Sequence, residues 1–400
     1  MSIFEVEKNF FMTISFENEK KQRLSKLQHA IANVHADACI ISTPVNLFYL
    51  CGFICDGYLF VEPDNEPILF IRRPSGIEGE NVIYVRKPEQ IPDFLRERNI
   101  RLPKKLLIEN DVLSHSTALR LQAAMHMPEL MNVSVEMRRI RSVKSEYELA
   151  RTRECATIHG EVYTQIPKLY RSGMTDIELQ IEIERSMRQK GSIGIFRAFG
   201  ENMEIFMGSI LAGDNAQAGS PYDFALGGAG LSEFLPIGAA GHPLKTGTTV
   251  MVDMAGNFGP WMSDMSRTFA IGTVPEIAHK AHRVSIDIHN AITATAKLGT
   301  ACSQLYLLAE KMAQEAGLGD YFMGTTQQAK FIGHGVGLEI NEPPVLTPRS
   351  KEVLERGMVI AVEPKFVLPG IGPAGIENTY IVNENGLEKI THCEEKLITL

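Results

Sequence analysis

The sequence predicts an α+β protein of two domains, in which a small α/β domain precedes a larger α+β domain. The chain has 400 residues, more than one average domain holds. Short apolar runs alternate with amphipathic segments up to about residue 130, whereas the second half combines long helices with paired strands. The polar segment 138–144 separates the two patterns and is interpreted as a hinge. We therefore place the domains at residues 1–140 and 141–400.

The elements of the first domain follow from hydrophobic periodicity and turn residues. An amphipathic helix opens at Arg23, and a short buried strand at 38–42 ends before Pro44. Further strands are predicted at 58–61, 68–71 and 106–109, the first two joined by a turn rich in Pro, Asp and Asn. Alternation of this kind is typical of a small α/β domain.

The helices of the second domain begin at recognisable caps. Ser145 with Glu148 and Thr175 with Glu178 form two capping boxes, in which hydroxyl and carboxylate satisfy free amides of the first turn. We expect the helices to run over 145–170, 175–191, 275–298 and 302–316. Strands are expected at 250–254, 266–271, 358–363 and 376–382. The region Gly200–Gly247 carries few signals and receives no assignment.

Composition excludes several classes of function. A net charge of −8 and a pI near 5.8 argue against a nucleic-acid partner or an anionic membrane surface. The N-terminus resembles no secretory signal, and no apolar run is long enough to span a membrane, so the predicted location is cytoplasmic. The six cysteines are scattered and are read as buried free thiols rather than disulfides or a zinc knuckle.

The chemistry of the chain is concentrated in four carboxylates and one imidazole of the second domain. They are Asp253, Asp264, His334, Glu363 and Glu377. Each acid falls at the end or start of a predicted strand, so two matched hairpins each deliver one carboxylate per strand. Carboxylates that converge in a sheet repel one another unless cations neutralise them. The set therefore predicts a site for two divalent cations.

A structural explanation competes with this one. Any single acid could be a solvated residue at a strand end, and a single histidine in an apolar stretch is more often a core residue than a ligand. Two observations favour the metal site. Asp253 and Glu363 each follow apolar runs and need a partner inside a core. Glycines flank His334 and let its backbone approach a ligand closely.

These motifs resemble the pita-bread metallopeptidase family, which includes methionine aminopeptidase, aminopeptidase P, prolidase and creatinase. The resemblance lies in Asp253, in SDMSRT at 263–268, in GHGVGLEINEPP at 333–344, in Glu363-Pro364 and in IENT at 376–379. NLFYLCGF at 46–53 resembles the N-terminal domain of creatinase and prolidase. The resemblance implies a C-terminal pita-bread domain preceded by a smaller creatinase-type α/β domain.

The resemblance also implies a mechanism and its cofactors. Asp253 would hold one metal, His334 and Glu363 the other, and Asp264 and Glu377 would bridge both. The implied activity is that of an Xaa-Pro aminopeptidase or dipeptidase that cleaves short peptides with a water held between the metals. Mn, Co, Zn or Fe suits such a site, with Mn favoured. Glu363 is the implied proton carrier, and a homodimer is the implied assembly.

Three departures from the family pattern leave the activity open. Asn341 stands where active Xaa-Pro peptidases carry a second histidine, and we assign it a catalytic role as a donor without a titrating proton. Leu235–Gly238 replaces another histidine, for which His242 is a weak substitute, and Gly375 stands where prolidase-like members often have arginine. Losing one donor to the transition state typically costs about 10²–10³ in rate.

Two alternatives therefore accompany the peptidase hypothesis. One is hydrolysis of a non-peptide C–N bond, as in creatinase-like and ectoine-hydrolase-like relatives, although creatinase lacks the metal ligands. The other is a weakly active or non-catalytic binding module on the same fold. Metal stoichiometry and a substrate panel distinguish the three hypotheses.

Overall fold

The computed structural model describes residues 3–200 and 206–400. The chain divides into two compact units between Arg141 and Ser142. Residues 201–205, which belong to the unassigned Gly200–Gly247 region, lie outside the described residues. The segment 138–144, predicted as a polar hinge, is largely helical, because α5 runs over Ser134–Ser142. Across the described residues, no helix is both long enough and apolar enough to cross a membrane.

The first unit is built on one six-stranded sheet with the order β4-β3-β2-β1-β5-β6. Its strands are β1 (Ala38–Ile41), β2 (Asp56–Val61), β3 (Ile68–Arg73), β4 (Val82–Tyr84), β5 (Lys105–Ile108) and β6 (Glu129–Asn132). The helices are α1 (Ile3–Asn33), α2 (Pro44–Cys51), α3 (Ile91–Glu97), α4 (His115–Ala124) and α5. The helix predicted from Arg23 is the C-terminal part of the longer α1, and the predicted strands are present.

The second unit holds the long helices and the strands that carry the acids. Its helices are α6 (Glu146–Leu169), α7 (Asp176–Gln189), α8 (Glu276–Thr295) and α9 (Cys302–Glu315). Its strands are β7 (Gly208–Ala212), β8 (Thr249–Gly256), β9 (Ser263–Ala270), β10 (Gly333–Gly335), β11 (Glu342–Val345), β12 (Val359–Val362), β13 (Lys365–Leu368), β14 (Gly372–Gly375), β15 (Asn378–Asn383), β16 (Gly386–Lys389) and β17 (Ile398–Thr399). Both predicted capping boxes form, at Ser145 with Glu148 and at Thr175 with Glu178.

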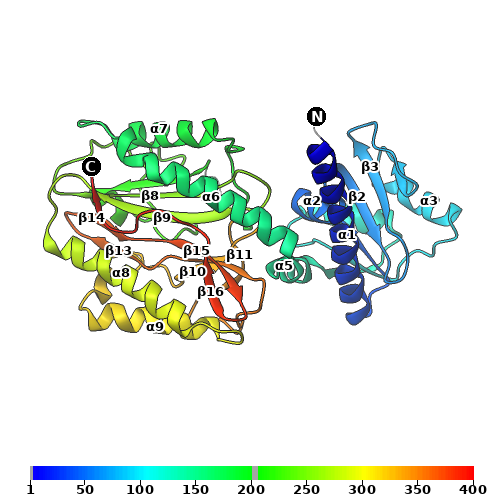
Figure 1. The fold of residues 1–400 in the computed structure, drawn as a ribbon. Helices are drawn as coiled ribbons and strands as arrows, with labels where there is room; N and C mark the ends of the chain where they lie inside the picture. The colour runs from blue at the N-terminus through cyan, green and yellow to red at the C-terminus, as the bar shows by residue number, and fades with distance from the viewer. Residues whose placement is uncertain (1–2, 201–205) are drawn as a thin grey trace. The chain divides into compact units, whose positions relative to one another are not determined.

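Two sheets and a short hairpin form the centre of this unit. The orders are β17-β9-β8-β7 and β11-β10-β12-β15-β16, and β13 pairs with β14. Figure 1 shows α6 and α7 on one side of the strands and α8 and α9 on the other. One apolar core joins α6 and α7 to β8 and β9, and a second joins α8 and α9 to β12 and β15. Strands from the two halves therefore meet in the interior, and the fold is α+β, as predicted.

A single threonine hydroxyl should contribute measurably to this unit, because Thr175 caps α7 by accepting the amide of Glu178 at 3.2 Å. We predict that Thr175→Ala lowers the free energy of unfolding by about 1 kcal/mol. Thr164→Ala is the matched control, since Thr164 is exposed on α6 and donates to a carbonyl one turn earlier. Urea unfolding of both variants measures the difference, and equal losses would contradict the capping role.

Candidate metal centre

Two antiparallel strand pairs deliver the four predicted carboxylates. On β8 and β9, Asp253 is opposite Ser266, and Asp264 is opposite Ala255. The two aspartates are therefore diagonal neighbours across one ladder, within reach of a shared site. On β12 and β15, Val362 is opposite Asn378, so Glu363 and Glu377 lie side by side just beyond that pair.

Hydrogen bonds join these two strand pairs at the level of the acids. The amide of Asp264 donates to Thr379 Oγ1 at 2.8 Å, and the same hydroxyl donates back to the Asp264 carbonyl at 2.7 Å. The amide of Glu377 donates to the Ser266 carbonyl at 3.1 Å, and Ser266 Oγ donates to Glu377 Oε2 at 2.6 Å. The buried guanidinium of Arg267 donates to the Glu377 carbonyl at 2.7 Å. The acids are therefore held in place by the backbone.

The imidazole of His334 completes the cluster from β10, which pairs with β12. Its Nε2 lies 3.6 Å from Glu363 Oε1 and 3.8 Å from Asp264 Oδ2. Its Nδ1 lies 3.1 Å from the Gly335 carbonyl, an acceptor that requires the proton on Nδ1. In the neutral ring with this tautomer, Nε2 carries the lone pair, which is the form of histidine that binds metals.

The five predicted ligands form two overlapping triads that share Glu377. One comprises Asp264, His334 and Glu377, and the other Asp253, Glu363 and Glu377, with ligand atoms in each within 4.8 Å of one another. Ligand atoms bound to one cation at about 2.1 Å lie roughly 3–4 Å apart. The distances from His334 Nε2 are too long for hydrogen bonds and suit this spacing. The triad of Asp264, His334 and Glu377 therefore fits one divalent ion.

A lysine occupies the other triad. Lys365 Nζ lies 2.7 Å from Asp253 Oδ2, 2.6 Å from Glu363 Oε2 and 3.2 Å from Glu377 Oε2. Its side chain has an exposed fraction of 0%. Lys365 is the first residue of β13, two residues after Glu363. Lys365 is not among the predicted site residues, although its place at the start of the apolar run Lys365–Leu368, two positions from a predicted ligand, was a usable signal.

Comparison with protein-family models identifies the chain. Residues 150–384 match the model of metallopeptidase family M24, and residues 23–143 match the creatinase/prolidase N-terminal domain. The chain belongs to metallopeptidase family M24. A relative from Staphylococcus aureus strain USA300, described as an uncharacterized peptidase, is 25% identical over 387 residues, which cover 93% of this chain and 99% of the relative.

Solved structures share the fold of this chain. An Xaa-Pro dipeptidase from Bacillus anthracis has a TM-score of 0.79 at 23% identity, covering 95% of this chain and 100% of that one. An X-Pro aminopeptidase from Thermotoga maritima has a TM-score of 0.77 at 21% identity, covering 94% and 99%. A prolidase from Pyrococcus horikoshii has a TM-score of 0.76 at 22% identity, covering 94% and 100%. The predicted family and fold are confirmed.

The acids of the M24 domain carry more negative charge than Lys365 alone neutralises. Burial raises the pKa of Asp264 well above its usual range, and the charge of Glu377 adds to the rise. Burial also raises the pKa of Glu363, against the opposing charge of Lys365. For Glu377, burial raises the pKa to about 8 even though Lys365 lowers it. Burial alone would lower the pKa of Lys365, but its carboxylate partners outweigh this effect and hold the ammonium charged.

The predicted catalytic residue Asn341 is engaged with backbone in the M24 domain. Its Oδ1 accepts the amide of Phe199 at 2.7 Å, and its Nδ2 donates to the Phe199 carbonyl at 2.6 Å. These two hydrogen bonds join the irregular segment before residue 200 to the loop that follows His334. The catalytic role of Asn341 stays a prediction. His242, the weak substitute for a missing histidine, is exposed on a loop.

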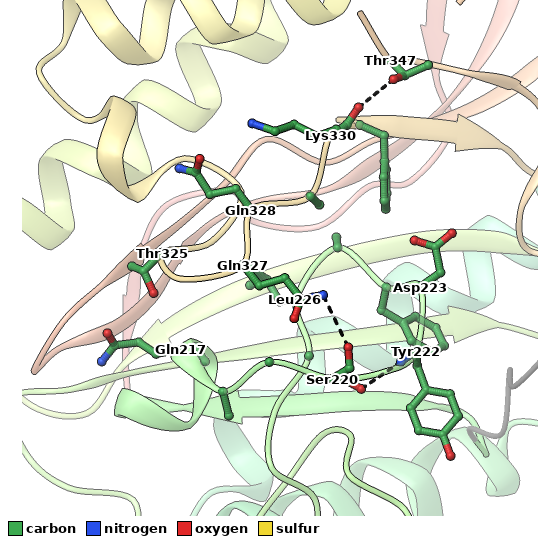
Figure 2. A pocket seen from close by; sticks show the side chains of 18 of the residues that line it. Gln217, Ser220, Tyr222, Asp223, Leu226, Thr325, Gln327, Gln328, Lys330 and Thr347 are labelled. Carbon is green, nitrogen blue, oxygen red and sulfur yellow. Dashed lines mark hydrogen bonds between the residues drawn. The ribbon is translucent and has the colours of Figure 1, made fainter. Parts of the chain in front are cut away.

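A cavity of about 380 Å³ is lined largely by the region that received no assignment from sequence. Figure 2 shows its two walls, one from residues 216–227 and one from residues 325–331. Gln327 donates to the Ser220 carbonyl at 3.4 Å across these walls. Part of Gly200–Gly247 thus builds a pocket lined by both polar and apolar side chains.

An apolar cluster connects this pocket to the strands of the metal centre. Ala216 and Leu226 line the pocket and pack with Met251 and Val367. Met251 precedes Asp253 by two residues on β8, and Val367 follows Lys365 by two on β13. Since side chains alternate along a strand, each pair lies on one face. The pocket therefore borders the face that carries Asp253 and Lys365.

The raised pKa of Glu377 predicts an unusual pH dependence of stability in metal-free protein. Between its ordinary value of 4.5 and about 8, the folded chain keeps a proton on Glu377 that the unfolded chain has lost. Stability must then fall as pH rises through this window. We predict that Glu377→Gln flattens the decline in Tm between pH 5 and 8, measured by calorimetry in a chelator.

Glu388→Gln is the control for this measurement. Arg153 holds the pKa of Glu388 below its ordinary value, so that carboxylate titrates below the tested window. Its removal should leave the slope between pH 5 and 8 unchanged. An unchanged or steeper slope in Glu377→Gln would refute the assignment of this proton to the metal centre.

Proposed function

We propose that this M24 metallopeptidase hydrolyses the bond that precedes proline in short peptides, as an Xaa-Pro dipeptidase or aminopeptidase. The observation that carries the proposal is the triad of Asp264, His334 and Glu377, in which an imidazole lone pair and two buried carboxylates converge. The names of the similar structures, Xaa-Pro dipeptidase, X-Pro aminopeptidase and prolidase, support the choice of substrate.

The residues of the centre have separable tasks in such a reaction. A divalent metal held by Asp264, His334 and Glu377 would supply a Lewis acid that polarises the amide carbonyl and increases the acidity of water. Glu363 is suited to carry the proton, because Lys365 binds its Oε2 while Oε1 faces His334. Oε1 can take a proton from the attacking water and give it to the leaving nitrogen. Lys365 fixes the orientation of that carboxylate.

The pocket beside the centre has the size and polarity that a short peptide requires. Its volume of about 380 Å³ lies at the lower end of the range for small-molecule sites. Asp223 and Lys330 both line it and bring opposite charges to its walls. A peptide of two or three residues carries an ammonium and a carboxylate in close succession, which these charges complement.

The remaining properties of this function are proposals of the same kind. Manganese is our preferred metal, because the carboxylates of Asp264 and Glu377 converge with one imidazole and hard oxygen ligands suit Mn²⁺. A homodimer and a cytoplasmic location stay predictions of the sequence analysis.

A second candidate function is hydrolysis of a non-peptide C–N bond. Two observations favour it, namely the lysine inside the centre and the engagement of both ends of the Asn341 amide by Phe199. Both alter the surroundings of the reacting carbonyl. A panel of Xaa-Pro dipeptides, longer Xaa-Pro peptides, small amidines and N-acyl amino acids separates the two candidates, since only the first hydrolyses the proline peptides.

Removal of the imidazole should abolish metal-dependent activity. We predict that His334→Ala lowers kcat/KM for an Xaa-Pro dipeptide with added Mn²⁺ by about 10²-fold or more, because the metal loses a ligand. His279→Ala on α8 is the control and should retain the wild-type rate. Equal activity of wild type and His334→Ala would exclude this centre as the site of hydrolysis.

Loss of the proton carrier should reduce the rate of the chemical step. We predict that Glu363→Gln lowers kcat by about 10²–10⁴ while the bound metal is retained, because the amide cannot accept the proton. The exposed Glu355 provides the matched control, Glu355→Gln, with unchanged kcat. Metal analysis beside the kinetics distinguishes lost proton transfer from lost metal, and an unaffected kcat would assign the proton to another group.

A further inference from the structure

We propose that Lys365 is a built-in cation that takes the place of one of the two metals, so that the centre binds a single divalent ion at Asp264, His334 and Glu377. The inference deepens the proposed function, because it rests on metal binding at that triad. It does not depend on the identity of the substrate.

The position of the ammonium is the first step of the argument. Lys365 Nζ contacts one oxygen each of Asp253, Glu363 and Glu377 at 2.6–3.2 Å. These three residues are the members of one of the two candidate metal triads. A metal in that triad would have to bind the same three carboxylates from the same space. The triad can therefore hold the ammonium or a metal, but not both.

The backbone around Lys365 keeps the ammonium in this place. β13 pairs with β14, where Gly375 is opposite Lys365. On the other side, the Met323 amide donates to the Lys365 carbonyl at 2.8 Å. The side chain starts two residues beyond Glu363 and is fully buried. With both edges of the strand bonded, the backbone of Lys365 is held beside the carboxylates.

The triad of Asp264, His334 and Glu377 remains suited to one metal. His334 Nε2 lies 3.8 Å from Asp264 Oδ2 and 3.6 Å from Glu363 Oε1. Four ionised carboxylates and one ammonium would leave three negative charges in a buried cluster. A single divalent ion would offset most of that excess, whereas a second ion would have to approach a fixed ammonium. Both the net charge of the cluster and the position of Lys365 therefore favour one bound metal ion.

The test is metal content read together with magnetic interaction. Purified full-length protein is loaded with Mn²⁺, freed of excess metal on a desalting column, and analysed by mass spectrometry for metal and by electron paramagnetic resonance. We expect about one Mn²⁺ per chain with the spectrum of an isolated ion. Lys365→Gly, which removes the ammonium and opens its space, should bind two ions with the spectrum of an exchange-coupled pair.

Lys144→Met provides the matched control, because Lys144 is also buried and pairs with a carboxylate, Glu342, at 2.9 Å. This variant should still bind one ion. Two coupled ions in wild type, or the same metal content in wild type and Lys365→Gly, would overturn the inference. If Lys365→Gly does not fold, metal content and the paramagnetic resonance spectrum are compared between Lys365→Ala and wild type instead. One bound ion without hydrolysis of Xaa-Pro peptides would reject the proposed substrate and leave the inference intact.

Discussion

Mutual repulsion of four carboxylates in a buried space is the constraint on which the catalytic unit depends. Two unit charges 4 Å apart interact by about 4 kcal/mol even at an effective dielectric constant of 20. Asp264, Glu363 and Glu377 are all buried, and their pKa values are all raised. Protonation, which the raised pKa values favour, and nearby cations both relieve this repulsion. Lys365 is the cation that the chain itself supplies in the described centre.

The architecture of the second unit is arranged around this constraint. Its two halves each have their own apolar core, one against α6 and α7 and one against α8 and α9. The strands that meet between these cores carry the acids. Hydrogen bonds of Thr379, Ser266 and Arg267 hold the two strand pairs in register. The polar contacts between the halves are thus concentrated where the charged groups lie, and the helices supply the apolar stabilisation.

Lys365 links stability to chemistry. Loss of one partner from a buried ion pair leaves an uncompensated charge, which typically costs about 3–5 kcal/mol. The same ammonium binds one oxygen of Glu363 and leaves the other facing His334. A residue that stabilises the cluster thereby also orients the proposed proton carrier. Family M24 membership places the chain among metallopeptidases.

The sequence by itself determined the fold class, the capped helices and the residue types of the candidate ligands. Capping boxes and strand periodicity depend on neighbours in the chain, so Ser145, Thr175 and the runs before Asp253 and Glu363 were readable. Only the tertiary structure decided which carboxylates share a cation. Asp253 contacts Lys365 from 112 positions away in the sequence, and the hydrogen bond between Ser266 and Glu377, 111 positions apart, joins the two strand pairs. Long-range packing also forms the pocket between residues 216–227 and 325–331. It likewise brings Asn341 into hydrogen bonds with Phe199. Local periodicity does not encode such packing.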